Sequence, residues 1–271
     1  MKTRSRFPDS EVNALMLRVA VLGALGNMGR EVTAAVLADS DLELVAAVDP
    51  AAVDGAAVSG SGMAVETEIS SIQSQEADVC VDFTHAAAAF QNALWALGQG
   101  IHCVIGTTGF SDEQLADMRE KAEAGSANVL VASNFAIGAV MMMKTAEMAA
   151  RAFDQCEIIE FHHRGKKDAP SGTAIATARR IADAMDAAEV PESAEHEVAG
   201  ARGGNVGPVR IHSVRLDGLV AHQEVIFGSK GETLTIRHDT TDRSCFMPGV
   251  LLAVKAIAEM PGLTVGLDSL L

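Results

Sequence analysis

Short apolar runs alternate with longer amphipathic stretches in the first half of the chain. Apolar runs at residues 17–22 and 42–48 flank a glycine-rich turn and a helical stretch over 30–38, which predicts a strand, helix, strand unit. The further predicted strands are 79–81, 101–105 and 129–131, separated by Ala-rich predicted helices over 86–98 and 112–124. Strands that are apolar on both faces are typical of a parallel sheet covered by helices on each side. The pattern therefore predicts a doubly wound α/β fold of the Rossmann-like kind.

After residue 135 the pattern changes to an alternation of polar and apolar positions. Period-two alternation separated by Gly-containing turns predicts strands of an antiparallel sheet. The predicted strands are 158–161, 207–215, 219–227 and 232–238, and the predicted helices are 174–188 and 250–259. The Gly-rich stretch 199–208 predicts a mobile loop. We therefore expect a second α+β domain with a mostly antiparallel sheet.

Composition excludes several classes of protein. The 271 residues include 21 Lys and Arg against 36 Asp and Glu, and the resulting formal charge of -15 repels nucleic acids and anionic membrane surfaces. No apolar stretch reaches the roughly 18 residues of a membrane helix, and the polar residues 1–16 predict a disordered arm. The 4 cysteines have no CxxC or zinc-ligand spacing, so we expect reduced thiols, no metal site and a cytoplasmic protein.

The turn from Gly23 to Gly29 joins the first predicted strand to the first predicted helix. Backbone N–H groups and a helix N-terminus at such a turn form a site for a pyrophosphate. The spacing is GxxGxxG, with Leu25 where the commoner GxGxxG pattern has its second glycine. Asp49 follows the second strand, where a carboxylate would accept hydrogen bonds from the ribose hydroxyls of NAD. The alternative interpretation is a tight turn with Asp49 capping the loop before Pro50.

Two later turns also follow predicted strands. Phe83-Thr84 follows the third strand, and Gly106-Thr107-Thr108-Gly109 follows the fourth. Loops at the carboxyl ends of parallel strands line the ligand crevice, so these hydroxyl groups would contact nicotinamide or ribose. The alternative is that both are ordinary strand-ending turns.

A basic cluster interrupts the acidic chain between His162 and Lys167. Adjacent histidines leaving a strand point to opposite sides and make a poor metal pair, whereas cationic side chains suit an anionic substrate. A lysine near other cations has a lowered pKa and can donate a proton. Ser171 is a predicted N-cap, so the N–H groups of Gly172 and Thr173 would form an adjoining carboxylate site. The alternative is a solvated basic turn.

These motifs, taken in order, resemble the dihydrodipicolinate reductase family from residue 17 to the C-terminus. The matching motifs are Gly23–Gly29, Asp82-Phe83-Thr84, Gly106–Phe110, Ser133-Asn134-Phe135 and the stretch from Glu160 to Ala174. The resemblance implies NAD(P)H-dependent reduction of 4-hydroxy-tetrahydrodipicolinate, a small cyclic dicarboxylate, to tetrahydrodipicolinate with loss of water. That reaction belongs to diaminopimelate and lysine biosynthesis.

The resemblance also implies roles for individual residues and an assembly. His162 and Lys166 correspond to the family's catalytic proton groups, and His163, Gly172 and Thr173 correspond to its substrate-carboxylate ligands. The implied cofactor contacts are Gly23, Ala24, Leu25, Gly26, Asn27, Met28, Asp49, Gly106, Thr107, Thr108, Ala132, Ser133, Asn134 and Phe135. Residues 17–133 and 244–271 would form the dinucleotide-binding domain, and residues 134–243 the substrate and oligomerisation domain of a homotetramer.

Cofactor choice is where the chain departs from part of the family. Some members carry arginines that receive the 2′-phosphate of NADPH, at positions held here by Asn27 and Pro50. A carboxylate at Asp49 without a nearby guanidinium repels that phosphate, so we expect a preference for NADH. Arg30 would partly compensate and keep NADPH usable.

Two other functions fit the nucleotide-binding half equally well. One is a two-domain reductase acting on a different carboxylate, because a nucleotide fold does not specify the substrate. The other is a sensor that binds NAD(H) and reports it to a partner without turnover. The stretch from His162 to Thr173 argues against the sensor, since a sensor needs no proton donors beside a carboxylate site.

Overall fold

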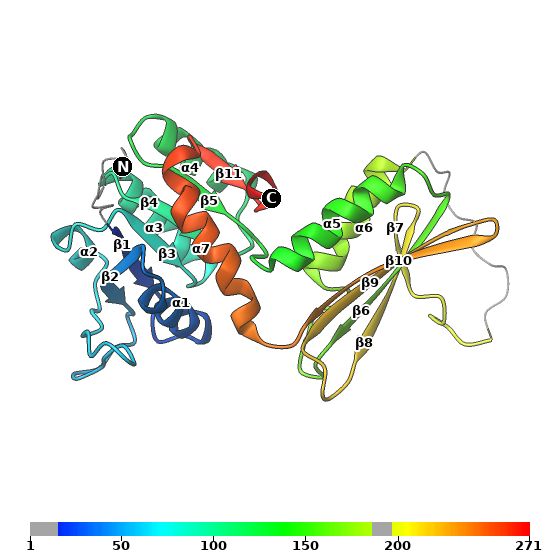
Figure 1. Cartoon of the computed structure of the whole chain (residues 1–271), viewed down its shortest axis with the longest axis horizontal. Helices are drawn as coiled ribbons and strands as arrows, with labels where there is room; N and C mark the ends of the chain where they lie inside the picture. Colours follow the sequence, from blue (N-terminus) through cyan, green and yellow to red (C-terminus); the bar gives the residue numbers. More distant parts are fainter. Residues whose placement is uncertain (1–15, 186–196) are drawn as a thin grey trace, which may run out of the picture.

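The computed structural model describes residues 16–185 and 197–271, which fold around two separate sheets (Figure 1). One sheet with its helices is built from the first half of the chain and the C-terminal segment, and the other from the stretch between them. Apart from Met16, the expected disordered arm lies outside the described residues. Among the helices that the structure describes, none is long and apolar enough to cross a membrane.

The first sheet has six strands, all parallel, in the order β11-β5-β4-β3-β1-β2. Its strands are β1 (Leu17–Leu22), β2 (Leu42–Val48), β3 (Val79–Asp82), β4 (His102–Ile105), β5 (Val129–Val131) and β11 (Leu263–Val265). The expected parallel sheet is confirmed, and β11 is an edge strand that the apolar pattern did not predict. Strand order reverses between β1 and β3, the position where ligands bind in sheets of this kind.

Helices cover both faces of this sheet. Alternate residues of β1 supply the two cores: Val19 and Val21 pack with α1 (Asn27–Ala38) and α7 (Met247–Ala256), while Ala20 and Leu22 pack with the helices opposite. Those are α3 (Ala86–Gly98) and α4 (Asp112–Glu123), and a short α2 (Ser71–Ser74) precedes β3. The strands are therefore apolar on both sides because each side is a core, as expected for a doubly wound sheet.

The second sheet has five strands in the order β10-β9-β6-β8-β7. Its strands are β6 (Gln155–His162), β7 (Gly204–Val206), β8 (Val209–Arg215), β9 (Ala221–Ser229) and β10 (Glu232–Thr240). Only the β6–β8 pair is parallel, so the expectation of a mostly antiparallel sheet is confirmed.

Residues 204–206 correct the prediction of a loop over 199–208. They form β7, which pairs antiparallel with β8, so that Gly204 lies opposite Ile211. Gly203, just before β7, is needed for this approach, because a Cβ there would lie 2.3 Å from the carbonyl oxygen of Ile211. The Gly-rich composition thus marks a close strand contact in this stretch.

Two helices cover one face of the second sheet. They are α5 (Ile137–Ala150) and α6 (Gly172–Ala184), and they bury Met142, Ala146 and Ile181 against it. Helix α6 starts two residues before the predicted helix and ends at Ala184; residues 186–188 of that prediction lie outside the described part. Helix α5 was not predicted, because its Met- and Ala-rich sequence gives a weak helical periodicity.

Within residues 16–185 and 197–271, the chain crosses between the sheets twice. Residues 132–136 lead from β5 into α5, and the short helix η1 (Arg243–Phe246) leads from β10 into α7 (Figure 1). After α7 and η2 (Ile257–Glu259), the chain adds β11 and ends in η3 (Asp268–Leu270). Asp268 in η3 accepts two hydrogen bonds from Arg180 in α6, which ties the C-terminal segment to the second sheet's helices.

Candidate active site

The glycine turn after β1 brings strand and helix into close contact. Gly23 has φ of +78°, a left-handed conformation that favours glycine. A Cβ at Gly29 would lie 2.0 Å from the carbonyl oxygen of Gly23, so only glycine fits at that helix position. Glycine is therefore favoured at the first position of the GxxGxxG pattern by its backbone conformation, and required at the third position by the lack of space for a Cβ.

The N-terminus of α1 presents donors at this turn. Gly26 occupies the N-cap position, and no side chain in the described residues caps the helix, so the N–H groups of Asn27 and Met28 remain available. Asp49 follows β2 and lies at the same turn, where its Oδ2 accepts the N–H of Leu25 at 3.0 Å. The available donors fit a pyrophosphate, and the adjacent carboxylate fits a ribose.

The loops after β3 and β4 are linked at the same edge of the sheet. Buried Asp82 accepts hydrogen bonds from the backbone N–H of Thr84 at 2.7 Å and from its hydroxyl at 2.6 Å. The hydroxyl of Thr107 donates to the carbonyl of Thr84 at 2.8 Å, and Gly106 lies directly beneath the ring of Phe83. Thr108 follows in the same loop. The two turns that the sequence singled out are thus one hydrogen-bonded unit.

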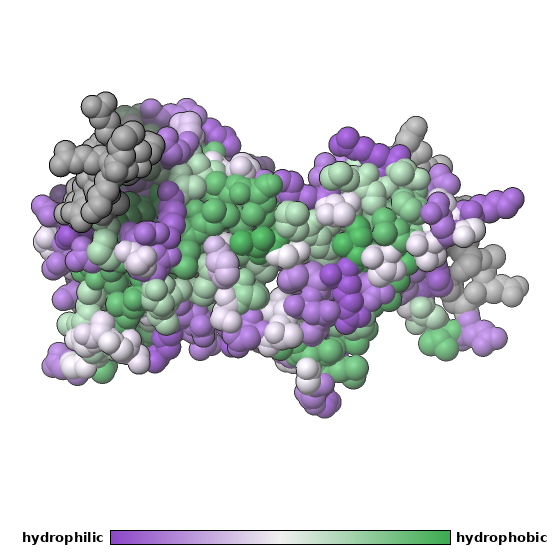
Figure 2. All heavy atoms as spheres, in the orientation of Figure 1, coloured by the Kyte–Doolittle hydropathy of each residue, from purple (hydrophilic) through white to green (hydrophobic). Residues whose placement is uncertain are grey.

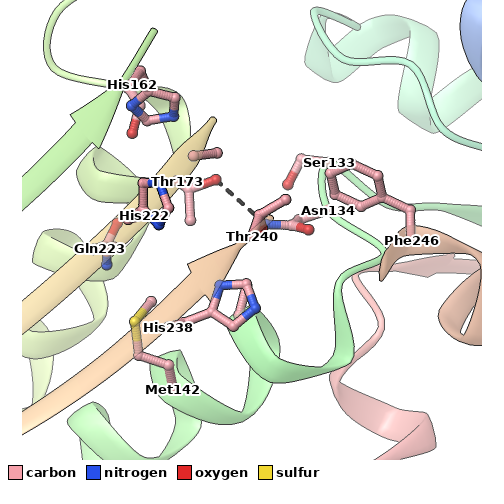
Figure 3. A pocket seen from close by; sticks show the side chains of 13 residues that line it. Ser133, Asn134, Met142, His162, Thr173, His222, Gln223, His238, Thr240 and Phe246 are labelled. Atoms are coloured by element: carbon pink, nitrogen blue, oxygen red, sulfur yellow. Dashed lines mark hydrogen bonds between the residues drawn. The ribbon is translucent and has the colours of Figure 1, made fainter. Parts of the chain in front are cut away.

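A pocket of about 190 Å³ lies where the loop after β5 meets the second sheet (Figure 3). Ser133 and Asn134 approach from the loop, while His162 and Thr173 come from the ends of β6 and α6. Asn134 Nδ2 lies 3.5 Å from Thr173 Oγ1, and this contact spans the pocket. The structure therefore brings together one predicted proton group, one predicted substrate ligand and two predicted cofactor contacts. Ala132 and Phe135, their neighbours in the loop, are buried.

The pocket also contains residues that the sequence analysis missed. These are Ala139, Met142, Ala221, His222, Gln223, His238, Thr240 and Phe246. Ser171, the predicted N-cap of α6, lines the pocket as well. Thr240 and His238 stand two apart on β10, so they share the sheet face that α5 and α6 cover. Period-two alternation gives that shared face. The pairing of β10 with β9, which places His238 opposite Gln223 and Thr240 opposite Ala221, is a long-range register that the sequence does not reveal.

Three predicted residues, Gly172, His163 and Lys166, lie near this pocket without lining it. Ser171 caps α6 as predicted, accepting the N–H of Ala174 at 3.2 Å, so Gly172 and Thr173 occupy the helix's first turn. His163 is exposed in the turn that follows β6. Lys166 Nζ pairs with Asp168 Oδ1 at 2.9 Å, and this hydrogen bond lowers the pKa of the Asp168 carboxyl.

Glu160 is a buried carboxylate beneath His162, and its side chain has 0% exposure. Its Oε2 lies 2.5 Å from His162 Nδ1, and Arg215 donates to both of its oxygens, at 2.9 and 2.7 Å. Burial raises the pKa of Glu160, but the hydrogen bonds from His162 and Arg215 outweigh burial and lower that pKa to about 2. Glu160 is therefore ionised throughout the physiological pH range.

Comparisons with known protein families match almost the whole chain, including the residues of this site. Residues 17–135 match the family model "Dihydrodipicolinate reductase, N-terminus", and residues 138–271 match "Dihydrodipicolinate reductase, C-terminus". The chain belongs to the dihydrodipicolinate reductase family. Its members are NAD(P)H-dependent oxidoreductases, so the reductase class expected from the motifs is confirmed.

Individual relatives of this family cover the chain almost completely. The chain is 51% identical to 4-hydroxy-tetrahydrodipicolinate reductase of Nocardia farcinica, over 95% of this chain and 99% of that protein. It is 50% identical to the reductase of the same name from Cutibacterium acnes, over 94% and 99%. A dipicolinate-bound dihydrodipicolinate reductase from Paenisporosarcina superposes with a TM-score of 0.87 at 39% identity, over 95% of this chain and 100% of that one.

Proposed function

We propose that the chain reduces 4-hydroxy-tetrahydrodipicolinate to tetrahydrodipicolinate, with NAD(P)H as hydride donor and with loss of water. The observation that carries the proposal is the pocket shared by Ser133 and Asn134 with His162 and Thr173. It places residues expected to contact the cofactor next to residues expected to act on the substrate. The dipicolinate bound by the Paenisporosarcina relative is a ring with two carboxylates, which supports a dicarboxylate as the substrate here.

The cofactor would be held along the carboxyl edge of the six-stranded sheet. The N–H groups of Asn27 and Met28 would bind its pyrophosphate, and Asp49 its adenosine ribose. The linked loop of Gly106, Thr107 and Thr108, together with residues 132–135, would contact the nicotinamide half. We accordingly assign residues 17–133 and 244–271 to dinucleotide binding, and residues 134–243 to substrate binding and assembly.

The substrate carboxylates would bind at the start of α6. The N–H groups of Gly172 and Thr173 lie in the first helical turn, where they have no partner within the helix. His163 and the other cations of the cluster would offset the second carboxylate. Such a local basic site is needed because the chain as a whole carries a charge of -15.

Proton transfer would be the work of His162 and Lys166. His162 lines the pocket. Lys166 is paired with Asp168, whose side chain is 59% exposed. The Lys166 side chain is 23% exposed. Ion pairs with a solvent-exposed partner typically contribute about 0.2 to 1 kcal/mol, so Lys166 could exchange Asp168 for a substrate at little cost. A positioned proton donor typically contributes about 10² to 10⁴ in rate.

The expected preference for NADH follows from the surroundings of the glycine turn. Asp49 faces the position of a 2′-phosphate and repels it, because Asn27 and Pro50 supply no cation. Arg30 Nε donates to the carbonyl of Leu25 at 2.9 Å, while the N–H of Leu25 donates to Asp49. A single residue thus connects the guanidinium to the carboxylate, which supports residual use of NADPH.

We propose that the chain assembles as a homotetramer through the second sheet. Helices α5 and α6 cover one face of this sheet, while Phe161, Ile159 and Ile226 on the other face are partly exposed. The loop between β8 and β9 carries the exposed Leu216 and Val220, and apolar atoms gather at that end of the molecule in Figure 2. Light scattering of the purified chain should give four times its monomer mass; a monomer would contradict this assembly.

The deciding experiment measures oxidation of NADH and NADPH with substrate generated in situ from pyruvate and aspartate semialdehyde. We expect turnover by the wild type, inhibition by pyridine-2,6-dicarboxylate, and a loss of about 10² or more in kcat for Lys166→Ala with NADH affinity retained. Lys121→Ala, at an exposed position of α4 away from the pocket, is the control for a lost lysine and should keep most activity. NADH binding without turnover would point instead to a different substrate or to a sensor.

A further inference from the structure

The carboxylate of Glu160 joins three elements that meet at the pocket. Glu160 belongs to β6. Its carboxylate accepts a hydrogen bond of 3.3 Å from the backbone N–H of Ser171 at the start of α6, and two hydrogen bonds from the guanidinium of Arg215 at the end of β8. We propose that Glu160, anchored by Arg215, is the positioning residue that fixes the ring orientation and tautomer of His162. This inference rests on the proposed function for its catalytic consequence, but not for its structural part.

The hydrogen bonds around Glu160 determine where the proton of His162 lies. Oε1 accepts from Arg215 and from the N–H of Ser171, while Oε2 accepts from Arg215 and contacts His162. An ionised carboxylate only accepts, and Arg215 keeps its charge, so Nδ1 of His162 must be the donor in the fourth contact. The proton on Nδ1 leaves Nε2 as the ring nitrogen that can exchange a proton with a substrate.

The same carboxylate also fixes the predicted substrate site. Its contact with the N–H of Ser171 holds the first residue before α6, whose next two N–H groups are the expected carboxylate ligands. Arg215 extends the link, because its Nη2 donates to the carbonyl of Asp168 at 2.7 Å. One buried ion pair therefore sets the distance between the proton-transferring ring and the substrate's carboxylate site. Its loss should change kcat as well as KM.

A second carboxylate on β6 provides a matched control. Glu157 also pairs with an arginine and a histidine, Arg202 and His212, and its Oε2 lies 2.8 Å from His212 Nε2. Its side chain is 37% exposed, and neither it nor its partners line the pocket. Glu157→Gln thus removes the same kind of charge, from the same strand, on the opposite face of the sheet.

The direct test reads the tautomer of His162 in the free protein. Two-dimensional ¹⁵N NMR of histidine-labelled protein, with the His162 signals assigned by their loss in His162→Gln, should show Nδ1 protonated in the wild type and in Glu157→Gln. Glu160→Gln should show a mixture of tautomers. An unchanged Nδ1-protonated ring in Glu160→Gln would overturn the proposal, whatever the substrate of the enzyme proves to be.

The kinetic test asks whether Glu160 acts through His162. We expect Glu160→Gln to lower kcat about tenfold or more and Glu157→Gln to leave it unchanged. In a His162→Ala background, adding Glu160→Gln should lower kcat by much less than tenfold; full additivity would contradict the positioning role. Lack of wild-type turnover would instead refute the proposed function and leave the NMR result standing.

Removal of a buried charge partner can unfold a protein, so folding needs its own control. Arg215→Lys keeps a cation beside Glu160 but cannot make both contacts with the carboxylate at once. We expect it to fold, to bind NADH, and to show the same mixture of tautomers to a smaller extent. A folded Arg215→Lys with a single Nδ1-protonated tautomer and full kcat would contradict the anchoring role of Arg215.

Discussion

Asn134 Nδ2 and Thr173 Oγ1 face each other across the pocket at 3.5 Å. Asn134 follows β5 of the six-stranded sheet, and Thr173 lies in the first turn of α6. The two residues belong to the two halves of the molecule, and each is expected to contact a different reactant. Asn134 Oδ1 also accepts the N–H of Ala136 at 2.8 Å, so the same side chain helps to start α5. These two roles of Asn134 can be separated by substitution.

Asn134→Asp should weaken substrate binding without weakening the fold. The aspartate keeps an oxygen for the N–H of Ala136 but places a negative charge beside Thr173, where a substrate carboxylate is expected. We expect KM for the dicarboxylate to rise about tenfold or more, with the melting temperature nearly unchanged. Thr173→Ser, which keeps the hydroxyl, is the control. A KM equal to that of the wild type would place the substrate elsewhere.

Arg30→Ala should sharpen the preference for NADH. The guanidinium is tethered to the carbonyl of Leu25 beside Asp49, where it can offset repulsion of a 2′-phosphate. We expect kcat/KM with NADPH to fall about tenfold while the value with NADH changes little. Arg179→Ala, at an exposed position of α6, controls for the lost charge. Equal losses with both cofactors would mean that Arg30 does not distinguish them.

The sequence predicted the sheet strands of the first half better than the pocket. The apolar composition of a run such as Leu17–Leu22 is enough to predict a buried strand. In the same way, Ser171 before Gly172 predicts the start of a helix from adjacent residues alone. Helix α5 was missed because a helix that is apolar on several sides has little periodicity. His238 and Gln223 were missed because only the register between β9 and β10 brings them to the pocket. Local patterns therefore predicted the elements, and pairing between distant segments assembled the site.

Acid should destabilise the protein partly through Glu160. Its pKa in the folded protein is lowered from 4.5 to about 2, so its contribution to stability is fully present above about pH 4.5 and is lost as pH falls toward 2. The free energy of unfolding of the wild type, measured in urea, should decrease between pH 5.5 and pH 3. Glu160→Gln should be less stable at pH 5.5 and lose less stability over that interval. Parallel pH profiles for the two proteins would show that Glu160 does not contribute.

Gly138→Ala should damage the pocket, although alanine is normally the better helix former. A Cβ at Gly138, near the start of α5, would lie 2.6 Å from Cδ2 of the His238 ring, so the ring or the helix must move. Alanine normally stabilises a helix by roughly 1 kcal/mol relative to glycine. Because of the clash with His238, we expect instead a loss of stability of about 1 kcal/mol or more and a lower kcat/KM.

Gly98→Ala is the matched substitution for this prediction. Gly98 also lies in a helix, but its added Cβ would meet only the flexible end of Lys121, at 3.4 Å. It should leave activity unchanged and melt at or slightly above the wild-type temperature, as measured by circular dichroism. If Gly138→Ala behaved like Gly98→Ala in both assays, His238 would not be confined by α5, and the pocket wall would be more adaptable than its packing indicates.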